Sequence, residues 1–347
     1  MTHNRVGDYS FQTVIDSFEP RLDELRPWLP KLGLSQQTVY FYGGFTDADG
    51  NRYAVERKFT GPMTAGVWLM SDRGGEQLLD PGTVRSTRGE VRRTFEPGRL
   101  QYADQLMARL GEELAPIGEQ GLDLAVTDDD LSWTEGELFS LRGDRLGAGV
   151  QVAAPMAEET FLYTSQLYPV AGTVLGADVR GFVFLDHGYW PHGRDWKESR
   201  VFTDIQVGWE VFANEYADGT IEWGHLCRGT GGNFTFAIAH DQDGLIARST
   251  DVDVRMDLDD ASYVPRATFA FGGDVWEWRG HEKGQLKQFN NARWGGYRAQ
   301  LGDTRRRGEE RELAHGFSWL ECFADRIRSD EIEPVDEPVS AGVGSNI

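Results

Sequence analysis

The sequence predicts an all-β protein, either a barrel or a sandwich, and three observations support that prediction. The chain of 347 residues contains 42 Gly, 11 Trp, 11 Tyr and 19 Phe. Large rings suit pleated, half-buried surfaces, while Gly suits the turns between many strands. Short apolar runs recur along the chain between turn signals. Strands and helices do not alternate, which argues against a nucleotide-binding α/β fold.

The N-terminal segment, residues 10–33, carries apolar residues at helix-like spacing, but its prolines would break a single long helix. We therefore expect residues 1–36 to form short helical pieces that lead into the first domain. From Gln37 the pattern changes to two aromatic or β-branched runs around Asp49-Gly50, which predicts a β-hairpin. A further strand is expected over residues 65–71.

One amphipathic helix is expected to interrupt the strands, because apolar residues after Pro97-Gly98 follow a helical period. Those residues are Ala103, Leu106, Met107, Leu110 and Leu114. Strands then resume, and Asp218-Gly219 and Asp243-Gly244 supply further hairpin turns. The last expected strand is the run HGFSWLECF.

The strands fall into two groups, separated by a break at residues 191–199 that is rich in Gly, Pro and charge. This organisation predicts one β domain over residues 37–190 and a second over residues 191–328. Residues 329–347 are acidic, contain Pro and have almost no large apolar side chains, so we expect a disordered tail.

Charge and composition exclude several classes of partner. The formal net charge of -21 repels phosphate backbones and anionic lipid headgroups. We therefore expect no nucleic-acid partner. No apolar run approaches the roughly 20 residues that cross a bilayer, so no membrane insertion is expected, and the N-terminus lacks a signal-like apolar stretch. A cytoplasmic location follows as the expectation, while the oligomeric state is not indicated.

Metal, nucleotide and nucleophile motifs are incomplete in this sequence. The runs TDADGN and HDQDG lack the full ligand set of a calcium loop, and GTGG lacks the Lys-Ser/Thr ending of a phosphate-binding loop. No His pair has the spacing that places two ligands on one helix face, and no Gly-x-Ser-x-Gly elbow occurs. We expect no cofactor and no metal, although strands can bring distant histidines together. Cys227 and Cys322 are expected to be buried free thiols.

The segment over residues 181–196, GFVFLDHGYWPHGRDW, has an unusual density of ionisable and aromatic groups. An apolar strand ends there in Asp186 and His187. Burial beside rings raises the pKa of a carboxyl, so Asp186 is a candidate proton donor near neutral pH. In the competing, structural interpretation, Asp186 and His187 form hydrogen bonds with the backbone where two sheets meet. Strand geometry favours this interpretation, because neighbouring residues on a strand point to opposite faces.

Residues 168–190, YPVAGTVLGADVRGFVFLDHGYW, extend this segment into a longer pattern. A strand with Gly172-Thr173 is followed by a polar turn at residues 176–178 and by a strand that ends at residues 186–189. This order resembles the signature of the tandem lipocalin-like (calycin-type) family, which includes carotenoid 1,2-hydratase, kievitone hydratase and lipocalin-like Diels–Alderases. The sequence departs from that pattern at Gly188, often a larger polar residue, and at Tyr189, often Trp.

The resemblance implies two consecutive lipocalin-like β-barrel or sandwich domains, with short N-terminal helices and one inserted helix. It implies a cofactor-independent hydratase, dehydratase or isomerase of secondary metabolism, acting on an apolar alkene such as a terpenoid, steroid or polyketide. Asp186 would protonate the alkene or an allylic hydroxyl, and His187 would fix the geometry of the acid. The expected substrate-binding residues are Tyr189, Trp190, Trp209, Trp223, Trp276 and Trp278.

Other interpretations remain open on the sequence. In one alternative, an aromatic cavity accelerates a pericyclic cyclisation by orienting a polyene, without any acid, and Asp186 is dispensable. A non-catalytic carrier of an apolar small molecule fits the same fold, since small barrels commonly hold one ligand. Exposed Trp residues would instead indicate a surface for a partner. Glu210, Glu277 and Asp195 are reserve acids for the enzymatic interpretation.

Overall fold

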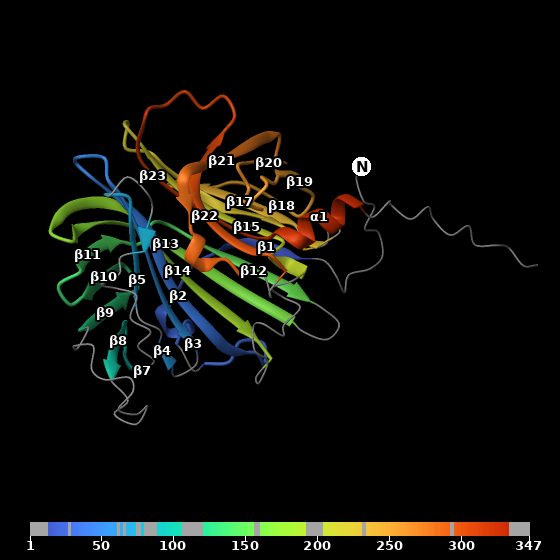
Figure 1. Ribbon diagram of the computed structural model, residues 1–347. Helices are drawn as coiled ribbons and strands as arrows, with labels where there is room; N and C mark the ends of the chain where they lie inside the picture. Colours follow the sequence, from blue (N-terminus) through green and yellow to red (C-terminus); the bar gives the residue numbers. More distant parts are fainter. Residues whose placement is uncertain are drawn as a thin grey trace, which may run out of the picture.

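The computed structural model describes residues 13–26, 29–60, 63–64, 67–73, 78–79, 89–105, 121–155, 160–191, 204–230, 234–291 and 295–332. These residues form two curled antiparallel sheets, the first from the N-terminal part of the chain and the second from the C-terminal part (Figure 1). The all-β fold class is confirmed. Within the described residues, no helix has the length and apolarity to span a bilayer.

The first sheet has 14 strands within the described residues. They are β1 (Val14–Phe18), β2 (Ser35–Asp47), β3 (Arg52–Thr60), β4 (Met63–Thr64), β5 (Trp68–Ser71), β6 (Leu78–Leu79), β7 (Gly89–Glu96), β8 (Arg99–Gln105), β9 (Leu122–Thr127), β10 (Asp130–Glu135), β11 (Phe139–Asp144), β12 (Gly149–Pro155), β13 (Thr160–Val174) and β14 (Ala177–Trp190). Because β14 pairs with both β2 and β13, the succession of pairings returns on itself and the sheet curls round an interior.

The second sheet has nine strands within the same limits. They are β15 (Gly208–Tyr216), β16 (Ile221–Arg228), β17 (Phe236–Asp241), β18 (Gly244–Ser249), β19 (Asp253–Asp257), β20 (Arg266–Phe271), β21 (Asp274–Gln285), β22 (Tyr297–Arg306) and β23 (Leu313–Phe323). Two 3-10 helices, η2 (Leu22–Glu24) and η6 (Lys287–Phe289), and the helix α1 (Ala324–Ile332) complete the described elements.

The hairpin of β13 and β14 carries the segment that the sequence singled out. Leu175 and Gly176 at its turn have φ angles of 48° and 80°, which is the left-handed pair that a tight two-residue hairpin requires. The register then places Asp186 opposite Ser165 on β13 and opposite Tyr40 on β2. Asp186 therefore lies on a central strand with neighbours on both sides.

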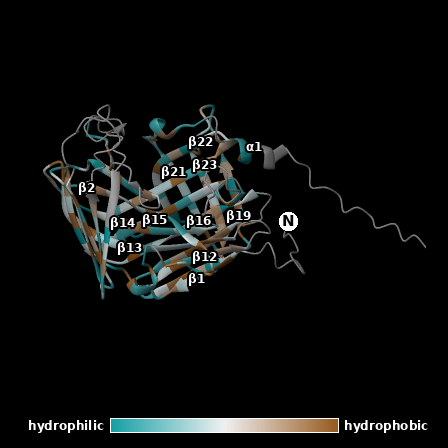
Figure 2. Cartoon of the chain, turned by 90° about the horizontal axis from the view of Figure 1, so that it is seen from below, coloured by the Kyte–Doolittle hydropathy of each residue, from teal (hydrophilic) through white to brown (hydrophobic). Residues whose placement is uncertain are grey.

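Each curled sheet has its own inner core, and the two sheets share a third core where they meet. Successive residues of a strand point to opposite faces, so Phe41 packs inside the first sheet while Tyr42 packs in the shared core. Across the sheets, the ring centroids of Tyr163 and Trp209 lie 5.0 Å apart. Figure 2 shows hydrophobic residues, in brown, on the strands of both sheets.

The N-terminal prediction of short helical pieces is wrong for residues 14–18, which form β1 and pair with β12. Pairing with β12 satisfies the backbone groups of residues 14–18, and only η2 (Leu22–Glu24) is helical in this part of the described chain. The expected hairpin at Asp49-Gly50 is present between β2 and β3.

Two further expectations are only partly covered by the described residues. Ala103, expected to begin the inserted helix, lies in β8 and pairs with Arg92 and Asp123, while residues 106–120 lie outside the described part. Ser329 to Ile332, expected in the acidic tail, belong to α1. The rest of that tail, residues 333–347, also lies outside it.

Candidate functional site

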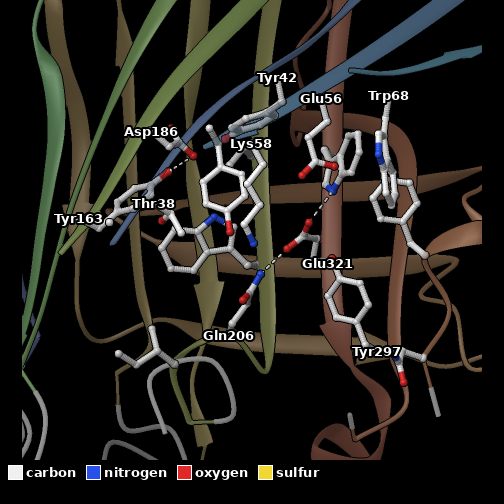
Figure 3. Close-up of a pocket in the computed structure, with 18 of the residues that line it drawn as sticks. Thr38, Tyr42, Glu56, Lys58, Trp68, Tyr163, Asp186, Gln206, Tyr297 and Glu321 are labelled. Atoms are coloured by element: carbon white, nitrogen blue, oxygen red, sulfur yellow. Dashed lines mark hydrogen bonds between the residues drawn. The ribbon is translucent and has the colours of Figure 1, made fainter. Parts of the chain in front are cut away.

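A cavity of about 480 Å³ lies between the two sheets. The first sheet lines it through β2, β3, β5, β13 and β14, and the second through β15, β22 and β23, with η6 and residues 205–206. Figure 3 shows Asp186 and Tyr163 at one end and Glu56, Glu321 and Trp68 towards the other. The volume is in the range of pockets that hold one small molecule.

Strand alternation decides which part of the Asp-His segment reaches the cavity. Asp186, Gly188 and Trp190 share one face of β14 and line the cavity. His187 and Tyr189 point to the opposite face, away from it. Gly188 leaves no room for a side chain there, since a Cβ would lie 2.8 Å from the Oγ1 of Thr38 and 2.9 Å from the ring of Trp190.

Asp186 is held as a buried acid at its end of the cavity, with 5% of its surface exposed. The hydroxyl of Tyr163 donates a hydrogen bond of 2.5 Å to its Oδ2, while Oδ1 accepts none from the described residues. Burial raises the pKa of Asp186 to about 7, against the opposing effect of the hydroxyls of Ser165, Tyr163 and Tyr42. Its carboxyl is therefore partly protonated near neutral pH.

Two tyrosines lie beside Asp186, and one of them, Tyr163, donates a hydrogen bond to it. Burial and the neighbouring charge of Asp186 raise the pKa of Tyr42 and of Tyr163 well above its usual value. Both phenols therefore keep their protons at neutral pH. Neither phenol therefore competes with the carboxyl as an acid.

The other end of the cavity holds two more carboxyls and an ammonium group. Burial and the charge of Glu321 raise the pKa of Glu56 to about 7, and Lys58 opposes this rise. Burial also raises the pKa of Glu321, whose carboxylate accepts hydrogen bonds from Gln206 and from Nε1 of Trp319, the latter at 3.1 Å. Lys58 lies over the ring of Tyr40, 4.9 Å from its centroid.

Aromatic rings from both sheets form most of the apolar wall. Trp68 and Phe289 pack edge to face with centroids 4.5 Å apart, and Phe289 lies 5.7 Å from Trp319 in the same manner. Trp209 lines the cavity beside Tyr163. Aromatic rings attract both apolar and cationic groups.

The six aromatic residues that were predicted to bind the substrate are divided between the cavity and the cores. Trp190 and Trp209 line the cavity. Trp223 lies in the shared core, stacked on His240 with centroids 4.9 Å apart. Trp276 and Trp278 are buried in the inner core of the second sheet. The structure thus brings two of the six predicted aromatic residues to the cavity; Tyr189 packs with Leu34 and Leu162 instead.

His187 does not contact the acid that it was expected to position. Its side chain is fully buried inside the first sheet, because adjacent residues of β14 face opposite ways. Burial, with the charges of Arg93 and Lys31, lowers the pKa of His187 to about 3, so the ring is neutral. Tyr163, and not His187, contacts Asp186.

The reserve acids do not line the cavity in the described structure. Glu210 is fully buried in the second sheet, where Thr304 donates a 2.6 Å hydrogen bond to its Oε1 and burial raises its pKa to about 8. Glu277 accepts a 2.7 Å hydrogen bond from Nε of Arg307, which lowers its pKa. Asp195 lies outside the described residues. Among the described residues, no three His, Cys, Asp or Glu side chains gather as metal ligands.

Sequence reasoning missed Tyr163, Glu56, Lys58 and Glu321 as cavity residues. Each is a polar residue in an otherwise apolar or alternating strand. Their position at a site depends on which face of each sheet meets the other. That information comes from sheet packing and not from local pattern.

Comparisons with known proteins give only remote structural similarity. The chain matches no protein-family model and no curated protein. A candidate AttH protein of Nitrosomonas europaea is 14% identical, with 83% of this chain and 93% of that chain covered and a TM-score of 0.41. Kievitone hydratase of Nectria haematococca is 11% identical, with 87% and 93% covered and a TM-score of 0.40.

Fold and site together define an all-β protein with a small-molecule cavity between two curled sheets. Aromatic residues form most of the apolar wall of the cavity, which also contains the acids Asp186, Glu56 and Glu321.

Proposed function

We propose that the protein is a cofactor-independent hydratase, dehydratase or isomerase for an apolar, alkene-bearing small molecule. The observation that carries this proposal is Asp186, a carboxyl with a pKa of about 7 on the wall of an aromatic cavity. A general acid works best when its pKa lies near the operating pH. A terpenoid, steroid or polyketide skeleton fits the apolar lining.

In the proposed reaction, the neutral carboxyl of Asp186 donates its proton to one carbon of the double bond. Tyr163 holds Oδ2 by a hydrogen bond, which leaves Oδ1 to carry the transferred proton. The other carbon becomes cationic, and the faces of aromatic rings such as Trp209 stabilise it by about 0.5–2 kcal/mol for each good contact.

Water then attacks the cationic carbon, and the resulting oxonium loses a proton to the carboxylate of Asp186. The net change is addition of one water across the double bond, and the acid is regenerated. The reverse sequence is dehydration. Loss of a proton from a neighbouring carbon, without water, gives isomerisation.

The test is incubation of the wild type and Asp186→Asn with a panel of terpenoid, steroid and polyketide alkenes in heavy-oxygen water. We expect products that contain the heavy isotope with the wild type and none with the Asn variant. Glu210→Gln is the matched control, because it neutralises a buried carboxyl that does not line the cavity.

The alternatives predict different outcomes in the same experiment. An unlabelled isomeric product that the Asp186→Asn variant still forms would replace the proposal by cyclisation through orientation. Binding without any product across the panel would replace it by a carrier. Circular dichroism of each variant separates loss of chemistry from loss of folding, and Tyr163→Phe, which keeps the acid, provides a second variant.

A further inference from the structure

The end of the cavity away from Asp186 combines two carboxyls with a group of aromatic rings (Figure 3). Glu56 comes from β3 of the first sheet and Glu321 from β23 of the second. Trp68, Phe289 and Trp319 form the adjacent wall, with successive centroids 4.5 Å and 5.7 Å apart. The site therefore exists only where the two sheets meet.

The hydrogen bonds of these two carboxyls are unequal. Glu321 accepts from Gln206 and Trp319. Glu56 interacts with Glu321 and Lys58 through charge, and it accepts no hydrogen bond from any described residue. A carboxylate on the wall of a largely apolar cavity is unfavourable unless a donor or a cation faces it. Glu56 therefore has an open place for a group supplied by a ligand.

The charges around the cavity are also unequal. The described lining contains three carboxyls, those of Glu56, Asp186 and Glu321, and one cation, Lys58. Lys58 is already placed over the ring of Tyr40. With Asp186 protonated, a second cation would balance the carboxylates of Glu56 and Glu321 without protonating them. A hydroxyl could donate a hydrogen bond but would bring no charge.

We propose that the molecule bound here carries a protonated amine, whose ammonium group lies beside Glu56 and Glu321 against the rings of Trp68, Phe289 and Trp319. Carboxylates with aromatic faces are the pairing that recognises alkylammonium groups, through charge and cation–π attraction. This inference rests on the proposed function in sharing its cavity. It narrows the substrate to an apolar, alkene-bearing amine.

The bound ammonium should change the protonation of the surrounding groups. The titratable side chains at this end are Glu56, Glu321, Lys58, Tyr40 and Tyr297. A cation placed among them favours ionised carboxylates, because opposite charges at short range lower the pKa of an acid. Amine binding near pH 7 should therefore release protons, whereas binding of a neutral alcohol should not.

The experiment compares tryptamine with tryptophol, which share an indole and differ in an amine against a hydroxyl. Titration calorimetry of each probe, in two buffers of different ionisation enthalpy, gives both the affinity and the number of protons released. We expect the wild type to bind tryptamine at least about tenfold more tightly than tryptophol. Proton release should accompany tryptamine alone.

Glu56→Gln should reduce this preference to about twofold or less, because it removes the unpartnered charge while keeping the shape. Glu321→Gln should also reduce the preference. If loss of the hydrogen bonds from Gln206 and Trp319 unfolds the Glu321 variant, Glu56→Gln still tests the inference. Glu210→Gln, a buried carboxyl that does not line the cavity, should keep the full preference.

Equal affinities for the two probes in the wild type would overturn the inference, as would a preference that survives Glu56→Gln. Neither result affects the labelling experiment on Asp186. Conversely, if no labelled product forms but the preference for the amine depends on Glu56, the protein binds amines without the proposed hydration. The two failures are therefore distinguishable.

Discussion

Replacing Asp186 with Asn is expected to make the protein progressively more stable than the wild type as the pH rises. The carboxyl has a pKa of about 7 in the folded protein and about 3.9 in an unfolded chain. At low pH both states hold the proton, so the wild type behaves like its neutral Asn isostere. As the pH rises, the carboxyl of the unfolded state ionises first. Its ionisation lowers the free energy of the unfolded state and so destabilises the folded wild type.

The magnitude follows from the two pKa values. Each pH unit between them changes the free energy of unfolding by about 1.4 kcal/mol for one proton. The variant should therefore gain about 2 kcal/mol on the wild type by about pH 6 and about 4 kcal/mol by about pH 8, both relative to about pH 4. Because Asp186 is 5% exposed, solvent screening reduces these values little.

Urea unfolding of both proteins at several pH values, followed by circular dichroism, measures the difference. Comparing the two proteins cancels the pH dependence of every other group that both retain. Asp178→Asn, which removes an exposed carboxyl from the same strand, controls for the loss of one negative charge from β14. A difference that stays flat between pH 4 and pH 8, or that appears equally in the Asp178 variant, would refute the reasoning.

Two further predictions concern the acid and the inner core of the first sheet. Activity should fall about tenfold per pH unit above about pH 7, as Asp186 loses its proton. Tyr163→Phe should move this fall to higher pH, because the hydrogen bond that it removes favours the carboxylate. A pH profile of kcat/KM for both proteins tests this prediction, and a fall at the same pH in the variant would contradict it. Glu135→Ala should cost about 3–5 kcal/mol in urea unfolding, since it removes a buried carboxylate that accepts hydrogen bonds from Arg57 at 3.1 Å and from Nε1 of Trp133 at 3.0 Å. A cost under about 1 kcal/mol would contradict the argument.

Much of the fold could be predicted because local pattern determines it. Alternation in β2 and β14, the turn at Asp49-Gly50 and the turn after β13 depend on residues near one another in sequence. The prediction for the N-terminal segment failed because residues distant in sequence determine its structure. Its spacing is helix-like, but β12 offers it an edge, and pairing with that edge was decided by a strand distant in sequence.

The candidate site was predictable only in part. Asp186 stood out because a carboxyl ended an apolar strand among aromatic residues. Strand geometry also predicted that Asp186 and His187 point apart, but it did not say which of the two would face a cavity. Trp276 and Trp278 illustrate the converse, since their aromatic character suits a core as well as a ligand site.

The sequence by itself determined the all-β class, the main turns and the presence of an acid after the apolar run of β14. These features follow from side-chain size, the two-residue period of strands and the conformational preferences of Asp-Gly pairs. Tertiary structure alone decided where the cavity lies. Glu56 and Glu321 meet, and Asp186 is buried beside Tyr163, because two curled sheets pack face against face. Burial by a distant part of the chain raises the pKa of Asp186 and makes it an acid suited to neutral pH.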